Sequence, residues 1–350
     1  MAPLAARPVP RVAILSPVPL DSPRGNAVTV RRIAEGLRAR GVDLDVWDME
    51  TPGLGERMLA QPLALVHAFH AYRTGRLALA LARVSGVPLV VTLTGTDVSH
   101  DLRDPSRAPS VREVLDSAAA VVAFHESIAA EVEAALPTLA GRVRIVPQSV
   151  RFPPSPDGQV RAPAIDGDPC ILFPAGIRPV KRPLLPLEPL ERLQREHPGL
   201  RLWYAGPRLE SAELRRLEQG LVGRPWARYL GAVPHAAMPA LLDAADIVLN
   251  CSESEGGMAN SVIEALALGR AVLASDIPGN RSLIEEDVTG LLFDSEAALT
   301  TQAARLAGDP ALRRRLGEAG RRLVAARLAP AREIEGYLET YAQVAGRSLV

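Results

Sequence analysis

Residues 245–269 read Ala-Asp-Ile-Val-Leu-Asn-Cys-Ser-Glu-Ser-Glu-Gly-Gly-Met-Ala-Asn-Ser-Val-Ile-Glu-Ala-Leu-Ala-Leu-Gly. An apolar run of strand length at 247–249 is followed by a polar loop with two glycines and by an Ala/Leu-rich helix that stops at Gly269. The free backbone N–H groups and the dipole at the start of such a helix favour an anionic group. The stretch therefore predicts a strand, a loop and a helix that together bind an anion.

The loop between this strand and this helix combines glycines with carboxylates. Gly256 and Gly257 allow a ligand to approach the main chain where a Cβ would block it. Glu255 and Glu264 flank the loop, and because carboxylates repel a phosphate, we expect them to accept hydrogen bonds from hydroxyl groups. A site for a phosphate together with hydroxyls indicates a nucleotide-sugar.

Chain length and composition favour two folded domains. At 350 residues the chain exceeds one ordinary core, and two domains of roughly 150 residues are the default. The apolar content of 47% is ample for folded cores and argues against extended disorder. Forty basic and forty acidic residues balance, so the overall charge predicts no nucleic-acid partner and no attraction to an anionic membrane.

The cysteines and the N-terminal segment indicate in which cellular compartment we expect the protein. Cys170 and Cys251 lie in or beside apolar strand-like runs, which is typical of buried thiols in a reducing compartment. No continuous apolar segment of the kind found in a signal peptide follows Arg7 and Arg11, and no run approaches about 18 apolar residues. We therefore expect a cytoplasmic protein with neither signal peptide nor transmembrane segment; peripheral contact with a membrane stays open.

Strand-like and helix-like segments alternate along the chain. In the first half the apolar runs fall at 11–19, 42–47, 63–69, 88–93, 119–124 and 143–146. In the second half they fall at 171–174, 202–205, 228–230, 247–249 and 271–274. This alternation predicts two α/β domains, each with a doubly wound parallel sheet, that face each other across a ligand-binding cleft.

A linker separates the two halves. Residues 151–169 are punctuated by proline and glycine and show no periodicity. We predict a first Rossmann-like domain at 1–152 on the acceptor side, a linker at 153–169, a second Rossmann-like domain at 170–328 that binds the nucleotide-sugar, and a C-terminal helical segment at 329–350.

The glutamate pair resembles a known motif. Glu255 and Glu264 look like the pair in the donor motif of the retaining glycosyltransferases of family 4, a large group with the GT-B fold. Eight residues separate Glu255 from Glu264, one more than is usual in that family, and ten separate Glu253 from Glu264. Glu253 is the alternative to Glu255 if the extra residue follows Glu255. The resemblance implies a final helix, at about 331–344, that packs back on the first domain.

A second part of the resemblance is Gly176-Ile-Arg-Pro-Val-Lys181, which follows the first strand of the second domain. The family places an arginine and a lysine at this spacing to hold the donor diphosphate. Arg178 can bind bidentately and Lys181 acts as a point charge. The alternative is a solvated loop with two ordinary surface charges. In the first domain, Gly25-Asn26 resembles the glycine loop that faces the diphosphate, although it lacks the G-x-G-x-x-G pattern.

The resemblance implies that Glu255 accepts hydrogen bonds from hydroxyls of the donor sugar and that Glu264 accepts them from hydroxyls of the ribose. Backbone N–H groups of the loop would bind sugar or phosphate. The complete expected donor-binding set is Gly25, Asn26, Gly176, Glu255, Gly256, Gly257, Met258 and Glu264. Glu264 also has a purely structural explanation, because Ser261-Val-Ile-Glu264 fits a capping box with Ser261 as the N-cap residue.

In the first domain, Leu93-Thr-Gly-Thr-Asp97 follows a strand at its carboxyl end. Gly95 permits close approach of a ligand, and Asp97 joins Arg178, Lys181 and Glu255 in the expected catalytic set. Many family members carry a histidine near here, and Leu93-Thr-Gly-Thr-Asp97 contains none. The alternative candidates are His67, His70 and the pair His125-Glu126, and each of these could instead have an ordinary structural role.

The set Gly25-Asn26, Leu93-Thr-Gly-Thr-Asp, Phe124-His-Glu-Ser, Gln148-Ser, Gly176-Ile-Arg-Pro-Val-Lys and Ile277-Pro-Gly-Asn280 is similar to a narrower branch, the glycosyltransferase-1-domain-containing proteins. Parts of it are also similar to selenosugar synthases. The resemblance implies a retaining hexosyltransferase-type enzyme that moves a sugar from a nucleotide-diphosphate donor, expected to be UDP-linked, to an unknown small-molecule, glycan or lipid acceptor.

Other chemistries lack support in the sequence. No zinc motif, P-loop or serine nucleophile elbow is present, and no Asp-x-Asp accompanies the cations at 176–181 to suggest a metal for the diphosphate, so we expect neither metal nor cofactor. A selenosugar synthase or a nucleotide-sugar epimerase on the same fold is the enzymatic alternative. A non-catalytic nucleotide-sugar-binding protein is the alternative of another class.

Overall fold

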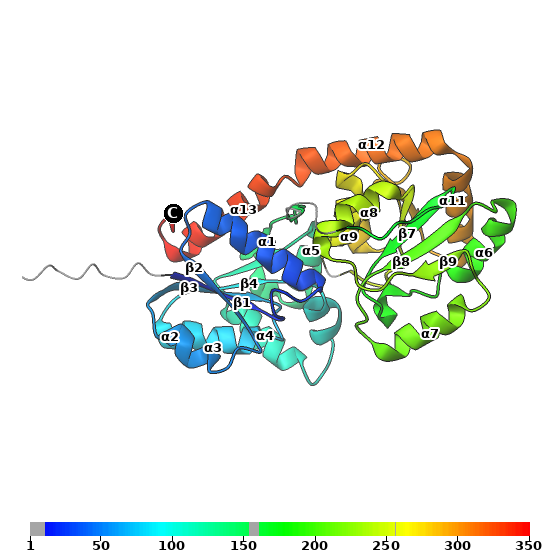
Figure 1. Ribbon diagram of the computed structural model, residues 1–350. Coiled ribbons are helices and arrows are strands. Elements are labelled where there is room, and N and C mark those ends of the chain that lie inside the picture. The colour runs from blue at the N-terminus through cyan, green and yellow to red at the C-terminus, as the bar shows by residue number, and fades with distance from the viewer. Residues whose placement is uncertain (1–10, 154–160, 256) are drawn as a thin grey trace, which may run out of the picture. The chain divides into compact units, whose positions relative to one another are not determined.

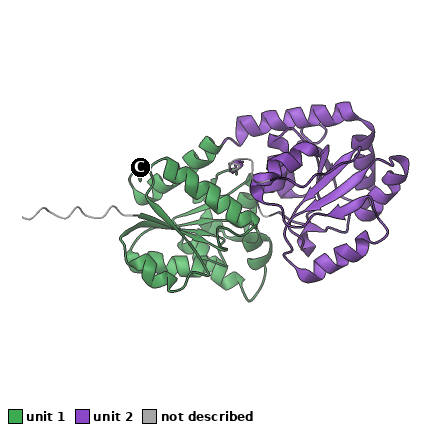
Figure 2. Cartoon of the chain, in the orientation of Figure 1, with its two compact units in different colours: residues 1–148, 330–350 green, residues 149–329 purple. Residues whose placement is uncertain are grey.

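The computed structural model describes residues 11–153, 161–255 and 257–350 (Figure 1). The chain divides into two units (Figure 2). Unit 1 combines Met1–Gln148 with Pro330–Val350, and unit 2 is Ser149–Ala329. Of the expected linker, residues 154–160 lie outside the described ranges, and residues 161–167 contain neither helix nor strand.

Unit 1 is built on a parallel sheet of six strands in the order β2-β1-β3-β4-β5-β6. The strands are β1 (Arg11–Ser16), β2 (Leu44–Asp48), β3 (Leu63–Phe69), β4 (Leu89–Thr92), β5 (Ala120–Ala123) and β6 (Val143–Ile145). The helices are α1 (Gly25–Ala39), α2 (Leu54–Leu59), α3 (Gly75–Ser85), α4 (Ala108–Ser117), α5 (Glu126–Ala135) and α13 (Pro330–Ala345), with short turns at Asp97–Asp101 and Pro137–Leu139.

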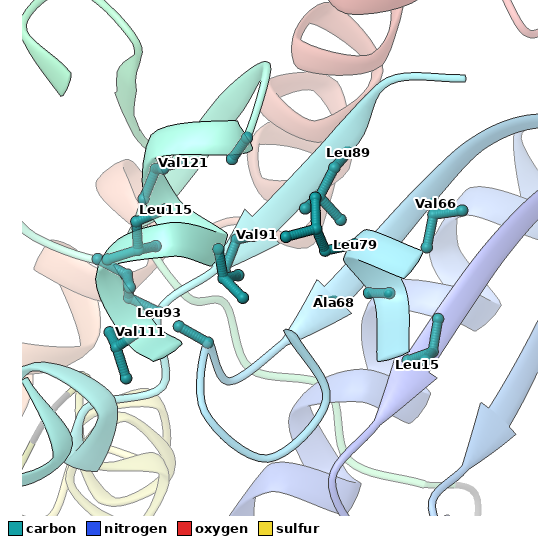
Figure 3. Packing of buried hydrophobic residues seen from close by; sticks show 14 of the residues in the cluster. Leu15, Val66, Ala68, Leu79, Leu89, Val91, Leu93, Val111, Leu115 and Val121 are labelled. Carbon is teal, nitrogen blue, oxygen red and sulfur yellow. The ribbon is translucent and has the colours of Figure 1, made fainter. Parts of the chain in front are cut away.

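Both faces of the central strands β3, β4 and β5 are buried, which explains why these strands are almost entirely apolar. One set of alternate residues, including Leu15, Val66 and Val91, packs with α2, α3, α4 and α5. Figure 3 shows these three residues together with Leu79 of α3 and Leu115 of α4. The other set, including Ile14 and Leu65, packs with α1 and α13. Because successive side chains of a strand point to opposite faces, an apolar residue at every position requires cover on both sides.

The C-terminal helix α13 belongs to unit 1 and is fixed there by buried polar contacts. The Arg32 guanidinium of α1 donates from Nε and Nη2 to the two carboxylate oxygens of Glu333, each at 2.8 Å. His67 Nδ1 lies 2.6 Å from the Tyr341 hydroxyl, and His67 Nε2 lies 2.7 Å from Oγ1 of Thr92. Residues about 300 positions apart in the sequence are thereby joined in one core.

Unit 2 repeats the architecture with a parallel sheet in the order β12-β11-β10-β7-β8-β9. Its strands are β7 (Cys170–Pro174), β8 (Arg201–Ala205), β9 (Ala227–Tyr229), β10 (Ile247–Asn250), β11 (Ala271–Ser275) and β12 (Leu291–Phe293). Its helices are α6 (Leu187–Glu196), α7 (Ser211–Leu221), α8 (Met238–Ala244), α9 (Asn260–Ala267), α10 (Pro278–Arg281), α11 (Glu296–Gly308) and α12 (Pro310–Arg327), with short turns at Pro179–Lys181 and His235–Ala237.

The strand order of unit 2 reverses between β7 and β10. From β7 the chain proceeds outward through β8 and β9, and it then returns to the other side of β7 with β10 and β11. Loops that leave neighbouring strands at such a point diverge and open a crevice at the carboxyl ends of the strands. We therefore expect the ligand-binding loops of unit 2 to be those that follow β7 and β10.

The expected alternation of strands and helices in two parallel sheets is confirmed. The edge strand β12 and the helix α2 were not expected, since their three and six residues give too little periodicity to recognise. Within the described ranges, no helix has both the length and the apolar character needed to cross a lipid bilayer.

Candidate functional site

The site in unit 2 lies where three loops leave the neighbouring strands β7, β10 and β11. The first loop carries Gly176, Arg178 and Lys181, and the second carries Glu255. A backbone hydrogen bond of 2.8 Å from the N–H of Glu253 to the carbonyl of Val180 ties these two loops together. The sheet thus brings together residues that are more than 70 positions apart in the sequence.

Lys181 and Glu255 form an ion pair at the centre of this site. Their side chains are 14% and 13% exposed, so both groups are largely withdrawn from water. Glu255 also accepts hydrogen bonds from Oγ of Ser252 at 2.6 Å and from Nδ2 of Asn250 at 3.3 Å. These three contacts all use Oε1 of Glu255, and Oε2 takes part in none of them.

Burial by itself would raise the pKa of Glu255, but the charge of Lys181 and the hydrogen bonds from Lys181, Ser252 and Asn250 outweigh it and hold the pKa below its ordinary value. Glu255 is therefore ionised at neutral pH. Glu253, the alternative candidate, is exposed. The helix α9 begins at Asn260, and Gly256 lies outside the described residues.

Arg178 comes directly before the short turn Pro179–Lys181. Its Nε is buried and has no hydrogen-bond partner among the described residues. A buried guanidinium nitrogen without a partner is costly, and a bound anion would satisfy it. Nε of Arg178 could therefore donate a hydrogen bond to a ligand, and the same loop carries Lys181.

A neighbouring arginine that the sequence analysis missed joins these two loops. Arg182 adopts the left-handed conformation with φ of 47°. Its Nε donates to the carbonyl of Cys251 at 2.7 Å. No motif signals this role, because it depends on two strands being adjacent in the sheet.

Glu264 is buried on α9, where its Oε1 lies 2.7 Å from Nε2 of His235. The ring of His235 packs against Phe152 with ring centroids 6.4 Å apart. The capping-box explanation of Glu264 is wrong, since the N-cap residue is Ala259 and Ser261 lies inside the helix. The side chain that contacts Glu264 comes from another element, and no sequence motif pointed to His235.

The candidates of unit 1 lie at the carboxyl edge of its own sheet. The carboxylate of Asp97 is fully buried and accepts backbone N–H groups of Gly95 at 2.6 Å, Thr94 at 3.1 Å and Ala71 at 3.1 Å. Asp97 therefore shapes the loops after β3 and β4. Gly25 and Asn26 form the first turn of α1, where Gly25 is exposed.

The three histidine candidates have different surroundings. His67 is in the core between Tyr341 and Thr92, and burial lowers its pKa to about 3. His70 adopts φ of 81° at the end of β3 and lies 2.9 Å from Oγ1 of Thr96. His125 has a lowered pKa because of burial, and its Nε2 is buried without a partner among the described residues.

Within the described part of the chain, no group of three or more His, Cys, Asp or Glu side chains is arranged to hold a metal ion. Arg178, Lys181 and Arg182 contribute positive charge to the site in unit 2.

Two families of known proteins match the sequence. Residues 159–323 match the glycosyl transferases group 1, and residues 46–148 match the glycosyl transferase 4-like domain. A glycosyltransferase 1 domain-containing protein 1 of Xenopus tropicalis is 26% identical over 311 residues, which cover 86% of this chain and 89% of that protein. A D-inositol 3-phosphate glycosyltransferase of Jonesia denitrificans is 28% identical over 286 residues, covering 74% of this chain and 66% of the relative.

Solved structures share the fold at low sequence identity. Sucrose-phosphate synthase of Thermosynechococcus elongatus superposes with a TM-score of 0.79 at 20% identity, covering 95% of this chain and 98% of that one. HepE of Anabaena in complex with UDP-glucose superposes with a TM-score of 0.77 at 15% identity, covering 95% and 99% of the two chains. At these identities the likeness establishes the GT-B fold.

Proposed function

The chain belongs to the group 1 glycosyltransferases, and we propose that it moves a sugar from UDP-sugar to an acceptor with retention of the anomeric configuration. The observation that carries the proposal is the loop after β7, which presents an unpartnered buried nitrogen of Arg178 three residues before Lys181. UDP is the proposed nucleotide because the similar HepE fold has been solved with UDP and with UDP-glucose.

The two cations would serve the departing diphosphate. As the bond between sugar and phosphate breaks, negative charge grows on the leaving oxygen, and fixed cations in a partly dry site stabilise that charge strongly. Arg178 would donate to phosphate oxygens through its free Nε, and Lys181 would add a point charge. With these two residues the reaction would not require a metal ion.

The two glutamates would orient the donor. Glu255 is ionised and keeps Oε2 free of its contacts with Lys181, Ser252 and Asn250, so this oxygen would accept hydrogen bonds from sugar hydroxyls. Glu264, held by His235, would accept hydrogen bonds from the ribose. Gly257 and Met258 lie between the two glutamates and would offer backbone N–H groups.

Retention would follow from attack on the same face as departure. In such a reaction the departing phosphate oxygen accepts the proton of the acceptor hydroxyl while that hydroxyl oxygen bonds to the anomeric carbon. The protein then contributes positioning and charge stabilisation, and no carboxylate nucleophile is needed.

A nucleotide-release assay over a panel of nucleotide-sugars tests the proposal. The assay is run with and without a mixed acceptor pool that includes selenophosphate. Release of UDP that requires one UDP-sugar and rises with an acceptor supports the transferase, and the configuration of the product decides retention. Release without glycosylated product, together with an epimerised sugar, would favour an epimerase. Saturable binding without release would favour a non-catalytic binding protein.

A further inference from the structure

The motif Ile277-Pro-Gly-Asn280 follows β11 and has no role in the donor contacts described above. Its residues form the short helix α10 and its entry. Both Gly279 and Asn280 are buried; Gly279 packs against the loop that carries Glu255, and Asn280 contacts Asn250 at the end of β10, directly before that loop. The motif therefore packs next to the segment that carries Glu255, the partner of Lys181.

Gly279 packs so closely against the main chain and the side chain of Glu255 that a Cβ at this position would not fit. A Cβ added at Gly279 would lie 2.7 Å from Cβ of Glu255, 2.7 Å from the carbonyl oxygen of Gly257 and 2.9 Å from the carbonyl oxygen of Glu255. Two of these atoms belong to backbone, so they cannot move aside by a rotamer change. The absence of a side chain at Gly279 thus permits the observed position of Glu255.

Asn280 reaches Glu255 through a chain of polar contacts. Its Nδ2 donates to the carbonyl of Ser275 at 2.9 Å and to Oδ1 of Asn250 at 3.3 Å. Asn250 in turn accepts from the N–H of Ser252 at 3.0 Å and donates from Nδ2 to Glu255 at 3.3 Å. Asn280 is fully buried, so each of these contacts is protected from competition by water.

We propose that Gly279 and Asn280 are positioning residues for the donor diphosphate. Gly279 sets the position of Glu255 by close contact, Asn280 sets it through Asn250, and Glu255 sets the position of the ammonium group of Lys181. The inference rests on the proposed function in one respect, namely that Lys181 binds the diphosphate.

The test is a double-mutant cycle that uses UDP as the probe. UDP affinity is measured for Gly279→Ala in the otherwise unchanged chain and in the Lys181→Met background. We expect Gly279→Ala to weaken UDP binding about tenfold in the first and to add nothing in the second, because Lys181 is no longer there to be misplaced. Asn280→Ser, which shortens the side chain and adds no bulk, is expected to follow the same pattern.

Two controls separate positioning from loss of structure. Gly308→Ala adds the same methyl group at the end of α11 in the same unit, where a Cβ meets nothing within 4 Å, and should leave UDP affinity unchanged. Uridine, which lacks the diphosphate, should bind Gly279→Ala and the unchanged chain equally. Thermal unfolding of each variant shows whether it is folded.

Three results would overturn the inference. Equal losses of UDP affinity from Gly279→Ala in both backgrounds would mean that the glycine acts independently of Lys181. Unchanged UDP affinity in both folded variants, Gly279→Ala and Asn280→Ser, would show that neither residue positions the site. If Lys181→Met itself leaves UDP affinity unchanged, the diphosphate assignment fails, and the inference fails with it; the first two results leave that assignment intact.

Discussion

Nε2 of His235 lies 2.7 Å from Oε1 of Glu264, between a turn after β9 and the helix after β10. The contact holds the buried carboxylate of Glu264 in one orientation, whereas the helix α9 by itself would allow several rotamers. The other oxygen of Glu264 takes no part in it. This arrangement suits a carboxylate that must accept hydrogen bonds from two adjacent hydroxyls, as a ribose presents them.

We expect His235→Phe to weaken UDP binding by about five- to tenfold, because it keeps the ring packing on Phe152 and removes only the contact to Glu264. Calorimetric titration with UDP and with 2′,3′-dideoxy-UDP measures the effect. The loss should be much smaller for the dideoxy nucleotide. An equal loss for both nucleotides would contradict the role of Glu264 at the ribose.

We expect Arg178→Ala and Lys181→Met each to weaken UDP binding by about 10- to 100-fold, because each removes a charge-assisted contact to the diphosphate. Arg178→Lys should restore only part of the affinity, since an ammonium group cannot reproduce the geometry of a guanidinium. The measurement is titration with UDP, and uridine serves as the matched ligand whose affinity should not change. A similar loss for uridine would indicate damage to the fold.

The stability of unit 1 should depend on pH through His67. Burial lowers its pKa from 6.5 to about 3 in the folded chain, so the unfolded chain binds the proton more readily. The stabilisation is present above pH 6.5 and is lost as pH falls toward 3, by up to about 1.4 kcal/mol per pH unit. Denaturant unfolding at several pH values, compared with His67→Asn, isolates this contribution. The variant should show a shallower loss of stability below pH 6.5, and identical slopes would contradict the prediction.

The ion pair between Arg32 and Glu333 should fix α13 to α1. Both side chains are nearly inaccessible, at 6% and 1% exposed, so neutralising one partner removes a buried, charge-assisted contact of the other. We expect Glu333→Gln to reduce the free energy of unfolding by about 3–5 kcal/mol. The double variant Arg32→Met with Glu333→Leu should lose less, since it buries no charge. Urea unfolding measures both, and hydrogen exchange in α13 shows whether the helix detaches first.

The sequence alone was sufficient for the alternation of strands and helices. Runs such as 63–69 and 271–275 are apolar except for His67 and Ser275, because each strand is covered on two faces, and that local pattern is readable without coordinates. It also named Arg178, Lys181 and Glu255 as candidates, because they resemble a family motif and because glycine, cations and carboxylates at strand ends are recognisable in the sequence. Short elements such as β12 escaped because three residues carry no period.

Only the tertiary structure decided how these residues meet. That Lys181 pairs with Glu255 follows from β7 lying next to β10, which sequence spacing does not reveal. In the same way, only the structure shows that the side chain of Glu264 contacts His235 and that Ser261 is not its capping partner. It also shows that the carboxylate of Asp97 accepts hydrogen bonds from backbone N–H groups. The physical reason is the same in each case: periodicity is a property of neighbours along the chain, whereas hydrogen bonds and ion pairs depend on which strands and helices the fold brings together.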